Sequence, residues 1–344
     1  MLPKIIKKDD LRAFVEALLA ENVVVAPTKK GIKYAFAEVD SFDEVALDYN
    51  ITMLSPRKYF YPQNETVLKF KLGEKPSAEA VVESAPKIIF GMHPCDVAAT
   101  WLLDVVFAED PADPNYLSKR KKAVIIGMNC AKPCDEFSFC KDMKSYNATA
   151  GFDLMLTDLG DKYFVEVGTE AGEALLVAGA QASEASADDL KALQEWQNGK
   201  EKSFVNRIPY DTKFLPEILG ASDDSLVWEA IARKCLSCGS CNTTCPTCYC
   251  FTVRDEVASN LVDGERKRIW DSCQLDEFAE VAGGENFRKA RSARLRHRFN
   301  RKGKWLLERY GKSGCVGCGR CDRNCLVKIS SVEVYTQLAG ERAK

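Results

Sequence analysis

Apolar residues in the first half of the chain alternate between helical spacing and short β-branched runs. Residues 10–27 have a charged start, then apolar positions three and four apart, then a valine run, which predicts a helix followed by a strand. Residues 151–172 predict two strands joined at Leu159-Gly160-Asp161, with alternation at Tyr163, Val165 and Val167. This half is therefore predicted to be mixed α and β.

Two further apolar runs end close to cysteines. KIIFGMHPCD and KAVIIGMNC each pass through β-branched residues and break at a glycine-containing turn that holds Cys95 or Cys130. Ligand-binding residues are concentrated in loops that a rigid scaffold positions. The two cysteines are therefore candidate ligands at strand ends.

The pattern becomes helical in the second half. Residues 180–202 lose the β signal and are rich in Ala, Glu, Lys and Gln, which predicts a surface helix and a domain boundary near residues 200–225. Residues 226–233 and 251–305 carry helix formers with few β-branched runs. The later cysteines are therefore expected in a mostly helical setting.

These patterns predict an α+β fold of two domains. Residues 1–215 would form a mixed α/β domain, and residues 216–344 a mostly helical domain. No stretch approaches the roughly 20 apolar residues that span a bilayer, and the charged start precludes a signal-peptide core. A cytoplasmic protein without a membrane span is expected.

Charge and cysteine content narrow the function. The formal net charge of -2 gives no general attraction to nucleic acid. The 15 cysteines are too many to be inert core residues, and an odd number in tight runs does not resemble a paired disulfide framework. Metal sites are therefore the favoured interpretation.

Two cysteine runs share one spacing. CLSCGSCNTTCP begins at Cys235 and CVGCGRCDRNCL begins at Cys315, and each contains C-x2-C-x2-C-x3-C. Both resemble the bacterial-type ferredoxin motif, in which three thiolates hold one face of a 4Fe-4S cubane and the fourth cysteine points to a neighbouring cluster. Pro246 follows the first run as the motif expects, whereas Leu326 takes that place in the second.

This resemblance implies that residues 216–344 form a dicluster domain of ferredoxin type, with crossed ligation of two 4Fe-4S clusters. Gly239, Gly317 and Gly319 suit it, because a loop folded onto inorganic sulfide needs close backbone approach and amide groups directed at sulfur. Zinc ribbons also use C-x2-C, but each zinc needs two such pairs rather than four consecutive cysteines. One cluster would take Cys235, Cys238, Cys241 and Cys325, and the other Cys315, Cys318, Cys321 and Cys245.

Four cysteines in the first half amount to the ligands of one more cluster. The spacing C-x3-C-x5-C from Cys130 is no standard ferredoxin motif, but the surrounding Gly, Pro and Asn predict loops that present side chains. A third 4Fe-4S cluster is predicted, with zinc or buried thiols as alternatives. His93 is more often a structural residue in such a position and is left out. The predicted ligands are Cys95, Cys130, Cys134 and Cys140.

The segment between the two runs holds further candidates. Cys248, Cys250 and Cys273 are interpreted as buried thiols beside the clusters, because eight ligands already complete two sites. Residues 288–304 contain nine Lys or Arg and no acid. Two interpretations of this segment remain: a solvated helix face, and a face that docks a partner or tunes a cluster. The overall charge disfavours nucleic-acid binding.

The sequence predicts no active site of its own. It has no G-x-G-x-x-G after a strand, no P-loop and no Ser-His-Asp arrangement, and only two histidines. We therefore expect an electron-transfer component of an oxidoreductase complex rather than an independent enzyme. A zinc-stabilised structural or regulatory scaffold is the alternative.

Several segments together resemble one family along nearly the whole chain. They are SPRKYFYP, GMHPCD, the NC...FC loop, GFDLMLTDL, VEVGTEAG, the two ferredoxin runs, IWDSC and the arginine-rich helix. The chain with these segments resembles the family that includes the beta subunit of cytoplasmic nickel-iron hydrogenases (sulfhydrogenases) and the corresponding iron-sulfur subunit of anaerobic sulfite reductase. Members often carry Cys-Phe-Cys where this chain has Ser138-Phe139-Cys140. This chain also has a cysteine at position 134 that departs from the family pattern.

The resemblance implies an iron-sulfur subunit of a hetero-oligomer used in anaerobic metabolism. Such a subunit relays electrons between a catalytic redox partner and a flavin-containing NAD(P)H-reactive subunit. The catalytic partner would be a hydrogenase, a reductase or a heterodisulfide-reductase-like complex.

Overall fold

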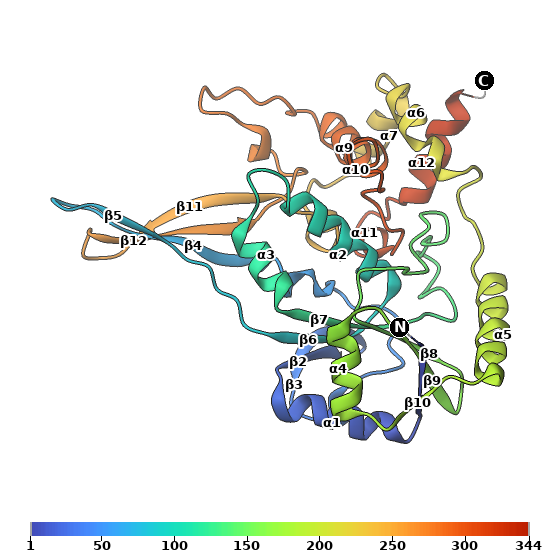
Figure 1. Ribbon diagram of the computed structural model, residues 1–344. Helices are drawn as coiled ribbons and strands as arrows, with labels where there is room; N and C mark the ends of the chain where they lie inside the picture. Colours follow the sequence, from blue (N-terminus) through green and yellow to red (C-terminus); the bar gives the residue numbers. More distant parts are fainter. Residues whose placement is uncertain (1, 343–344) are drawn as a thin grey trace.

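The computed structural model describes residues 2–342, which form two β-sheets and a helical part (Figure 1). The larger sheet has eight strands in the order β10-β1-β9-β8-β7-β6-β2-β3. Its central strands β2, β6, β7 and β8 run parallel. The eight strands are β1 (Lys4–Lys7), β2 (Val24–Lys30), β3 (Lys33–Val39), β6 (Lys87–Met92), β7 (Ala123–Met128), β8 (Leu154–Asp158), β9 (Lys162–Val167) and β10 (Ala182–Glu184).

Helices cover both faces of this sheet, which explains the nearly continuous apolar runs of β6 and β7. Ile88 and Phe90 face the core that includes α1 and α4, whereas Ile89 faces the core that includes α2 and α3. The helix and strand predicted over residues 10–27 and the two strands predicted over residues 151–172 are confirmed. The helices of this part are α1 (Asp10–Glu21), α2 (Pro94–Phe107), α3 (Pro114–Lys121), α4 (Glu170–Gly179) and α5 (Ala187–Ser203).

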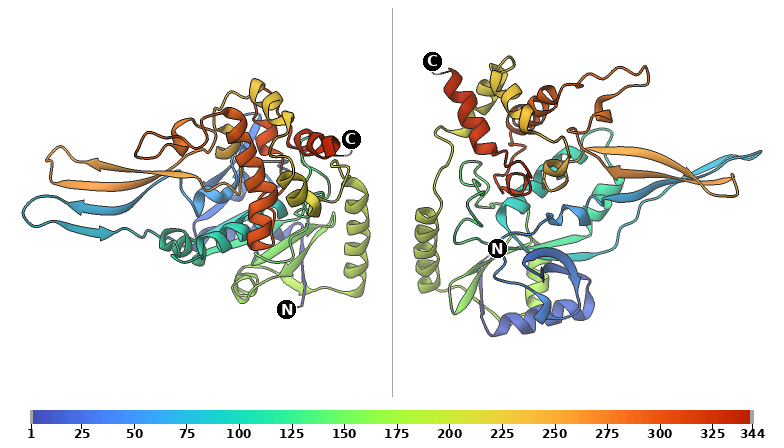
Figure 2. Two further views of the ribbon diagram at one scale, coloured as in Figure 1. Left: turned by 90° about the horizontal axis from the view of Figure 1, so that it is seen from above. Right: turned by 180° about the vertical axis from the view of Figure 1, so that it is seen from behind.

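The smaller sheet is an antiparallel arm that projects from the body of the molecule (Figures 1 and 2). Its order is β11-β12-β4-β5, so a hairpin from between the two ferredoxin runs pairs with a strand from the first half of the chain. The helical expectation for residues 251–305 is wrong over this hairpin. The four strands are β4 (Asn64–Lys71), β5 (Ser77–Ala80), β11 (Phe251–Val257) and β12 (Asp263–Trp270).

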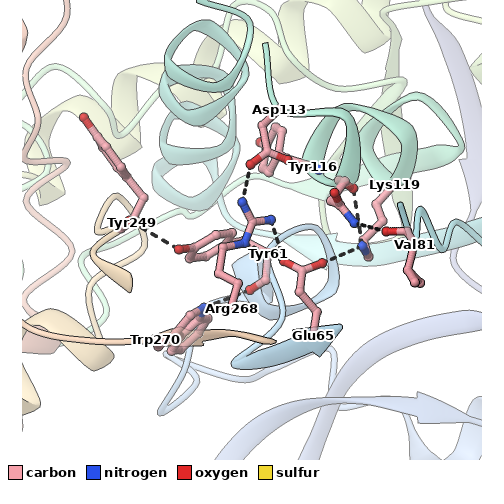
Figure 3. A network of polar contacts seen from close by, with 10 residues as sticks. Tyr61, Glu65, Val81, Asp113, Tyr116, Lys119, Tyr249, Arg268 and Trp270 are labelled. Atoms are coloured by element: carbon pink, nitrogen blue, oxygen red, sulfur yellow. Dashed lines mark hydrogen bonds and ion pairs between the residues drawn. The ribbon is translucent and has the colours of Figure 1, made fainter. Parts of the chain in front are cut away.

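A buried ion-pair network fixes the arm to the body (Figure 3). The Arg268 guanidinium on β12 donates through Nε to Glu65 of β4, at 2.9 Å, and also contacts Asp113 next to α3. Trp270 Nε1 donates to the Tyr61 carbonyl at 3.2 Å. These contacts connect residues that are 155 to 209 positions apart along the chain.

The helical part packs around its own apolar core, which also includes Phe139 and Met143 from the first half of the chain. None of the helices within residues 2–342 combines the length and apolar character that crossing a membrane requires.

The sheets and the helical part together confirm the α+β fold class. The domain boundary at residue 215 stays a prediction. The helices are α6 (Leu215–Gly220), α7 (Leu226–Lys234), α8 (Ser240–Thr243), α9 (Arg291–Asn300), a π-helical segment η5 (Arg301–Trp305), α10 (Leu306–Tyr310), α11 (Arg320–Arg323) and α12 (Ser331–Arg342), with short 3-10 turns at Phe42–Glu44, Pro56–Tyr59, Thr212–Phe214 and Glu277–Ala279.

Candidate iron-sulfur centres

Cysteines of both ferredoxin runs line one cavity in the helical part. The first run follows α7, and Gly239 in the left-handed region, with φ of 77°, turns the chain into α8. Apolar side chains such as Leu295 and Phe299 complete the cavity wall, and Cys321 also reaches it. The three cysteines of the first run that line this cavity, together with Cys325, are called the first cysteine group: Cys235, Cys238, Cys241 and Cys325.

The last cysteine of the first run lies beside the second run. Burial is the main cause that raises the pKa of Cys315 to about 12, and the nearby Cys245 raises it further. Cys245 acts in the same direction on Cys318 and Cys321. The second cysteine group is therefore Cys245, Cys315, Cys318 and Cys321. Cys245 also acts on Cys241 of its own run, so the exchange of fourth cysteines that the ferredoxin resemblance implies stays a prediction.

The backbone around both groups has the shape that a sulfur-rich cluster needs. Ser237 and Gly317 adopt positive φ angles, of 54° and 60°, in the turns that follow Cys235 and Cys315. Ser237 N donates to Cys235 Sγ at 3.4 Å, Gly317 N to Cys315 Sγ at 3.4 Å, and Ile329 N to Cys325 Sγ at 3.3 Å. Amide donors directed at ligating sulfur are the contacts that 4Fe-4S clusters use. The cysteines and the backbone around them therefore fit such clusters.

The four cysteines from the first half of the chain also come together. Strands β6 and β7 are parallel neighbours, so their carboxyl ends meet at one edge of the sheet, where Cys95 begins α2 and Cys130 follows β7. A hydrogen bond from Cys130 lowers the pKa of Cys134 to about 5. Cys140 packs in the same buried cluster. We call Cys95, Cys130, Cys134 and Cys140 the N-terminal cysteine group.

His93, which was left out of the predicted ligand set, borders this group. Its Nδ1 lies 3.8 Å from Cys134 Sγ, and its ring stacks on Tyr49 with 4.2 Å between the ring centroids. The contact with His93 adds to the lowering of the Cys134 pKa. His93 is thus a buried neighbour that hydrogen-bonds to the group and packs against an aromatic ring.

The N-terminal cysteine group lies directly against the second ferredoxin run. Phe139 N donates to the Gly317 carbonyl at 2.7 Å, and Ser145 Oγ donates to the Val316 carbonyl at 2.5 Å. A Cβ on Gly317 would lie 2.4 Å from the Phe139 carbonyl oxygen, and one on Gly319 would lie 2.6 Å from the Phe137 carbonyl. Only glycine therefore permits this approach, which brings Cys318 into the same buried cluster as Cys95 and Cys140.

A buried ion pair bridges the two halves of the chain beside these cysteines. Arg320, which precedes Cys321, is fully buried and donates from both Nη atoms to the Asp96 carboxylate at 2.7 and 2.8 Å. Asp96 itself follows Cys95. This ion pair was not predicted from the sequence. The available signal was that each partner is adjacent to a cysteine, Asp96 to Cys95 and Arg320 to Cys321.

Some basic side chains of residues 288–304 point into the protein, and others point to the surface. Arg298 and Lys302 are only 7% and 5% exposed, and Lys302 Nζ donates to Thr247 Oγ1 at 2.6 Å. The charges that act on Arg298 come from Cys241, Cys321, Cys245 and Cys248 rather than from carboxylates. Arg294 is buried too. A solvated face is thus the wrong interpretation for these three residues. Arg294 pairs with Asp276 at 2.5 Å, whereas the positions of Arg298 and Lys302 beside cysteine sulfur favour cluster tuning.

The residues that the structure describes form no site of the kind that holds a single metal ion. Within residues 2–342 no three His, Cys, Asp or Glu side chains converge closely enough to hold one ion. Each iron of a cubane takes one thiolate, so four thiolates around a cluster stand farther apart than four thiolates around one ion.

Fold and cysteine geometry together define an iron-sulfur protein of the dicluster ferredoxin class. Residues 234–329 match the profile of the 4Fe-4S dicluster domain, which implies iron-sulfur clusters in this part of the chain. The chain is also 34% identical over 326 residues to sulfhydrogenase 2 subunit beta of Pyrococcus furiosus, covering 94% of this chain and 95% of that protein. The chain belongs to the sulfhydrogenase beta subunit family, which confirms the resemblance. No solved structure matches it.

Proposed function

We propose that this chain is the electron-transfer subunit of a hetero-oligomeric oxidoreductase. It would relay electrons through 4Fe-4S clusters between a catalytic hydrogenase, reductase or heterodisulfide-reductase-like partner and a flavin-containing NAD(P)H-reactive subunit. One observation carries the proposal: the first, second and N-terminal cysteine groups lie in series, with Cys321 reaching the first cavity and Cys318 packed with Cys95. A series of sites with two ends suits a chain that connects two partners.

Each cysteine group would hold one cluster, and together they account for 12 of the 15 cysteines. When bound, 4Fe-4S clusters accept and give up single electrons at potentials that protein contacts set. The thiolates anchor the irons, and the amides of Ser237, Gly317 and Ile329 stabilise charge on sulfur. Arg298 and Lys302 offset negative charge between the first and second groups.

Crossed ligation predicts a specific spectroscopic result. Replacing Cys325 by Ser should perturb the cluster of Cys235, Cys238 and Cys241, because Cys325 lines their cavity although it is distant in sequence. Mössbauer and EPR spectra of the anaerobically loaded chain check this, with Cys245→Ser as the matched variant for the other cluster. Perturbation by Cys325→Ser of the cluster held by its sequence neighbours would contradict crossing.

The N-terminal cysteine group gives the test of the relay. In the purified complex, replacing Cys130 and Cys134 by Ser should remove about four iron atoms per chain. It should also reduce passage of electrons from NAD(P)H to the catalytic partner to background, while NAD(P)H still reduces the flavin. Zinc in place of the lost iron, or undiminished electron passage, would refute the third cluster as part of the relay.

A further inference from the structure

Three cysteines outside the proposed relay gather where the arm meets the helical part. Cys250 immediately precedes β11 and Cys273 follows β12, and the two strands are paired at this end of the hairpin, where Phe251 lies opposite Trp270. Asp271 N donates to the Cys250 carbonyl at 3.0 Å, which keeps the chain ends together. The hairpin therefore places two cysteines that are 23 positions apart side by side.

The three thiols form one group in the interior. Cys250 and Cys273 act on one another through a side-chain hydrogen bond and by charge. Cys248 interacts mainly with Cys245 of the second cysteine group and also, more weakly, with Cys250. Cys248 and Cys273 are buried, and Cys250 is partly buried. Their hairpin and C-x-C arrangement provides three sulfur donors from two backbone segments.

Two buried amides donate to the sulfur of Cys273. Asn242 Nδ2 lies 3.0 Å from Cys273 Sγ and 3.9 Å from Cys250 Sγ, and Gln274 Nε2 lies 3.5 Å from Cys273 Sγ. Both amide side chains are 1% exposed. A neutral thiol accepts hydrogen bonds weakly, whereas a metal-bound thiolate accepts them well. The donors therefore suit a ligating Cys273.

A buried cation next to the group lacks a carboxylate. Arg57 is 4% exposed, its guanidinium lies 3.7 Å from the ring centroid of Trp270, and its Nε has no hydrogen-bond partner. In the part of the chain that the structure describes, the charges that act most on it are Cys248 and Cys245. A buried charge is costly unless an opposite charge compensates it. The required anion therefore lies on the side of these cysteines.

We propose that Cys248, Cys250 and Cys273 ligate a further iron-sulfur cluster at the root of the arm. With three protein thiolates it is either a 3Fe-4S cluster or a 4Fe-4S cluster whose fourth iron takes a donor other than cysteine. Thiolate ligation makes this cluster the acceptor for Asn242 and Gln274. It also places negative charge on Cys248 beside Arg57, in addition to that of Cys245 in the second cysteine group. The site does not depend on the proposed relay, because it uses none of the 12 cysteines assigned there.

Iron analysis of the full chain tests the site. The double variant Cys250→Ser/Cys273→Ser, loaded anaerobically with iron and sulfide, should contain about three or four fewer iron atoms per chain than the unmodified protein. The Mössbauer components of the other clusters should remain. Ser272→Ala is the matched control, because Ser272 is a buried neighbour of Cys273 without a thiol, and it should keep all the iron. Unchanged iron in the double variant, or loss of one zinc instead, would overturn the proposal.

Two further measurements decide the matter even if the double variant does not fold. Asn242→Leu should retain the iron but shift the spectrum of the same component, because it removes a donor to Cys273. The iron content of the unmodified chain should exceed the iron of the two dicluster cubanes plus the iron that is lost in Cys130→Ser/Cys134→Ser. No such excess would refute this site, whereas no loss in Cys130→Ser/Cys134→Ser would refute only the third relay cluster.

Discussion

Replacing Arg320 by Met is expected to lower the free energy of unfolding by about 3–5 kcal/mol, the usual cost of removing one partner from a buried ion pair. Arg320 and Asp96 are each 1% exposed at the side chain, and the guanidinium also donates to the Thr52 carbonyl at 2.9 Å and to Thr52 Oγ1 at 3.0 Å. The substitution leaves the Asp96 carboxylate buried without a partner. The penalty arises from this uncompensated charge rather than from lost packing, since Met nearly preserves the volume.

Urea unfolding followed by circular dichroism and by the visible absorption of the clusters measures the effect. Adding Asp96→Asn to Arg320→Met should restore much of the stability, because the stranded charge is then gone. Arg309→Met is the matched control, as Arg309 pairs with Glu109 on the surface at 2.8 Å and should leave the unfolding midpoint near that of the unmodified chain. Equal shifts for Arg320→Met and Arg309→Met would contradict this account.

Arg298→Gln is expected to lower the midpoint potential of at least one C-terminal cluster by on the order of 100 mV. A unit charge about 4 Å away is worth roughly 4 kcal/mol at an effective dielectric constant of 20, and a tenfold change in a one-electron equilibrium corresponds to about 59 mV. Arg298 lies among Cys241, Cys245 and Cys321, which belong to the first and second cysteine groups. Reduction adds negative charge, so losing this cation disfavours the reduced state.

A redox titration monitored by EPR checks the direction and size of this shift. Arg296→Gln is the control on the same helix, because the Arg296 side chain is 39% exposed and faces Asp223 at 3.9 Å. It should leave the potentials unchanged, provided that both variants carry the full iron content. Unchanged potentials in Arg298→Gln would mean that its charge is neutralised by something other than the clusters.

Local patterns were sufficient to predict five strands of the main sheet, namely β2, β6, β7, β8 and β9. The apolar runs before Cys95 and Cys130 form parallel neighbours β6 and β7, and a parallel pair places its carboxyl ends at one edge. Repetition of one cysteine spacing in both runs, together with the ferredoxin resemblance, implied the exchange of Cys245 and Cys325. Both predictions depend on short sequence segments and on the known way in which cysteines bind iron-sulfur clusters.

The arm could not be predicted, because its strands lack the usual signal. A strand with one buried face alternates apolar and polar residues, but β11 is exposed on both faces and carries charges such as Arg254, Asp255 and Glu256. Its neighbour β12 pairs with β4, which lies far away in the sequence. Likewise, the burial of Arg298 and Lys302 depends on cysteine sulfur rather than on nearby acidic residues, so the sequence around them resembles a solvated helix.

The pairing of β4 with β12 also has a consequence for biosynthesis. Residues 65 and 268 become neighbours only after 203 further positions have been translated, which takes about 10–40 s at the usual rate of about 5–20 residues per second. During this interval one edge of β4 has no native partner, and an unpaired strand edge favours association with other chains. The nascent chain is thus exposed to misassembly on the ribosome until its second half emerges, and a bound chaperone would be most useful during that time.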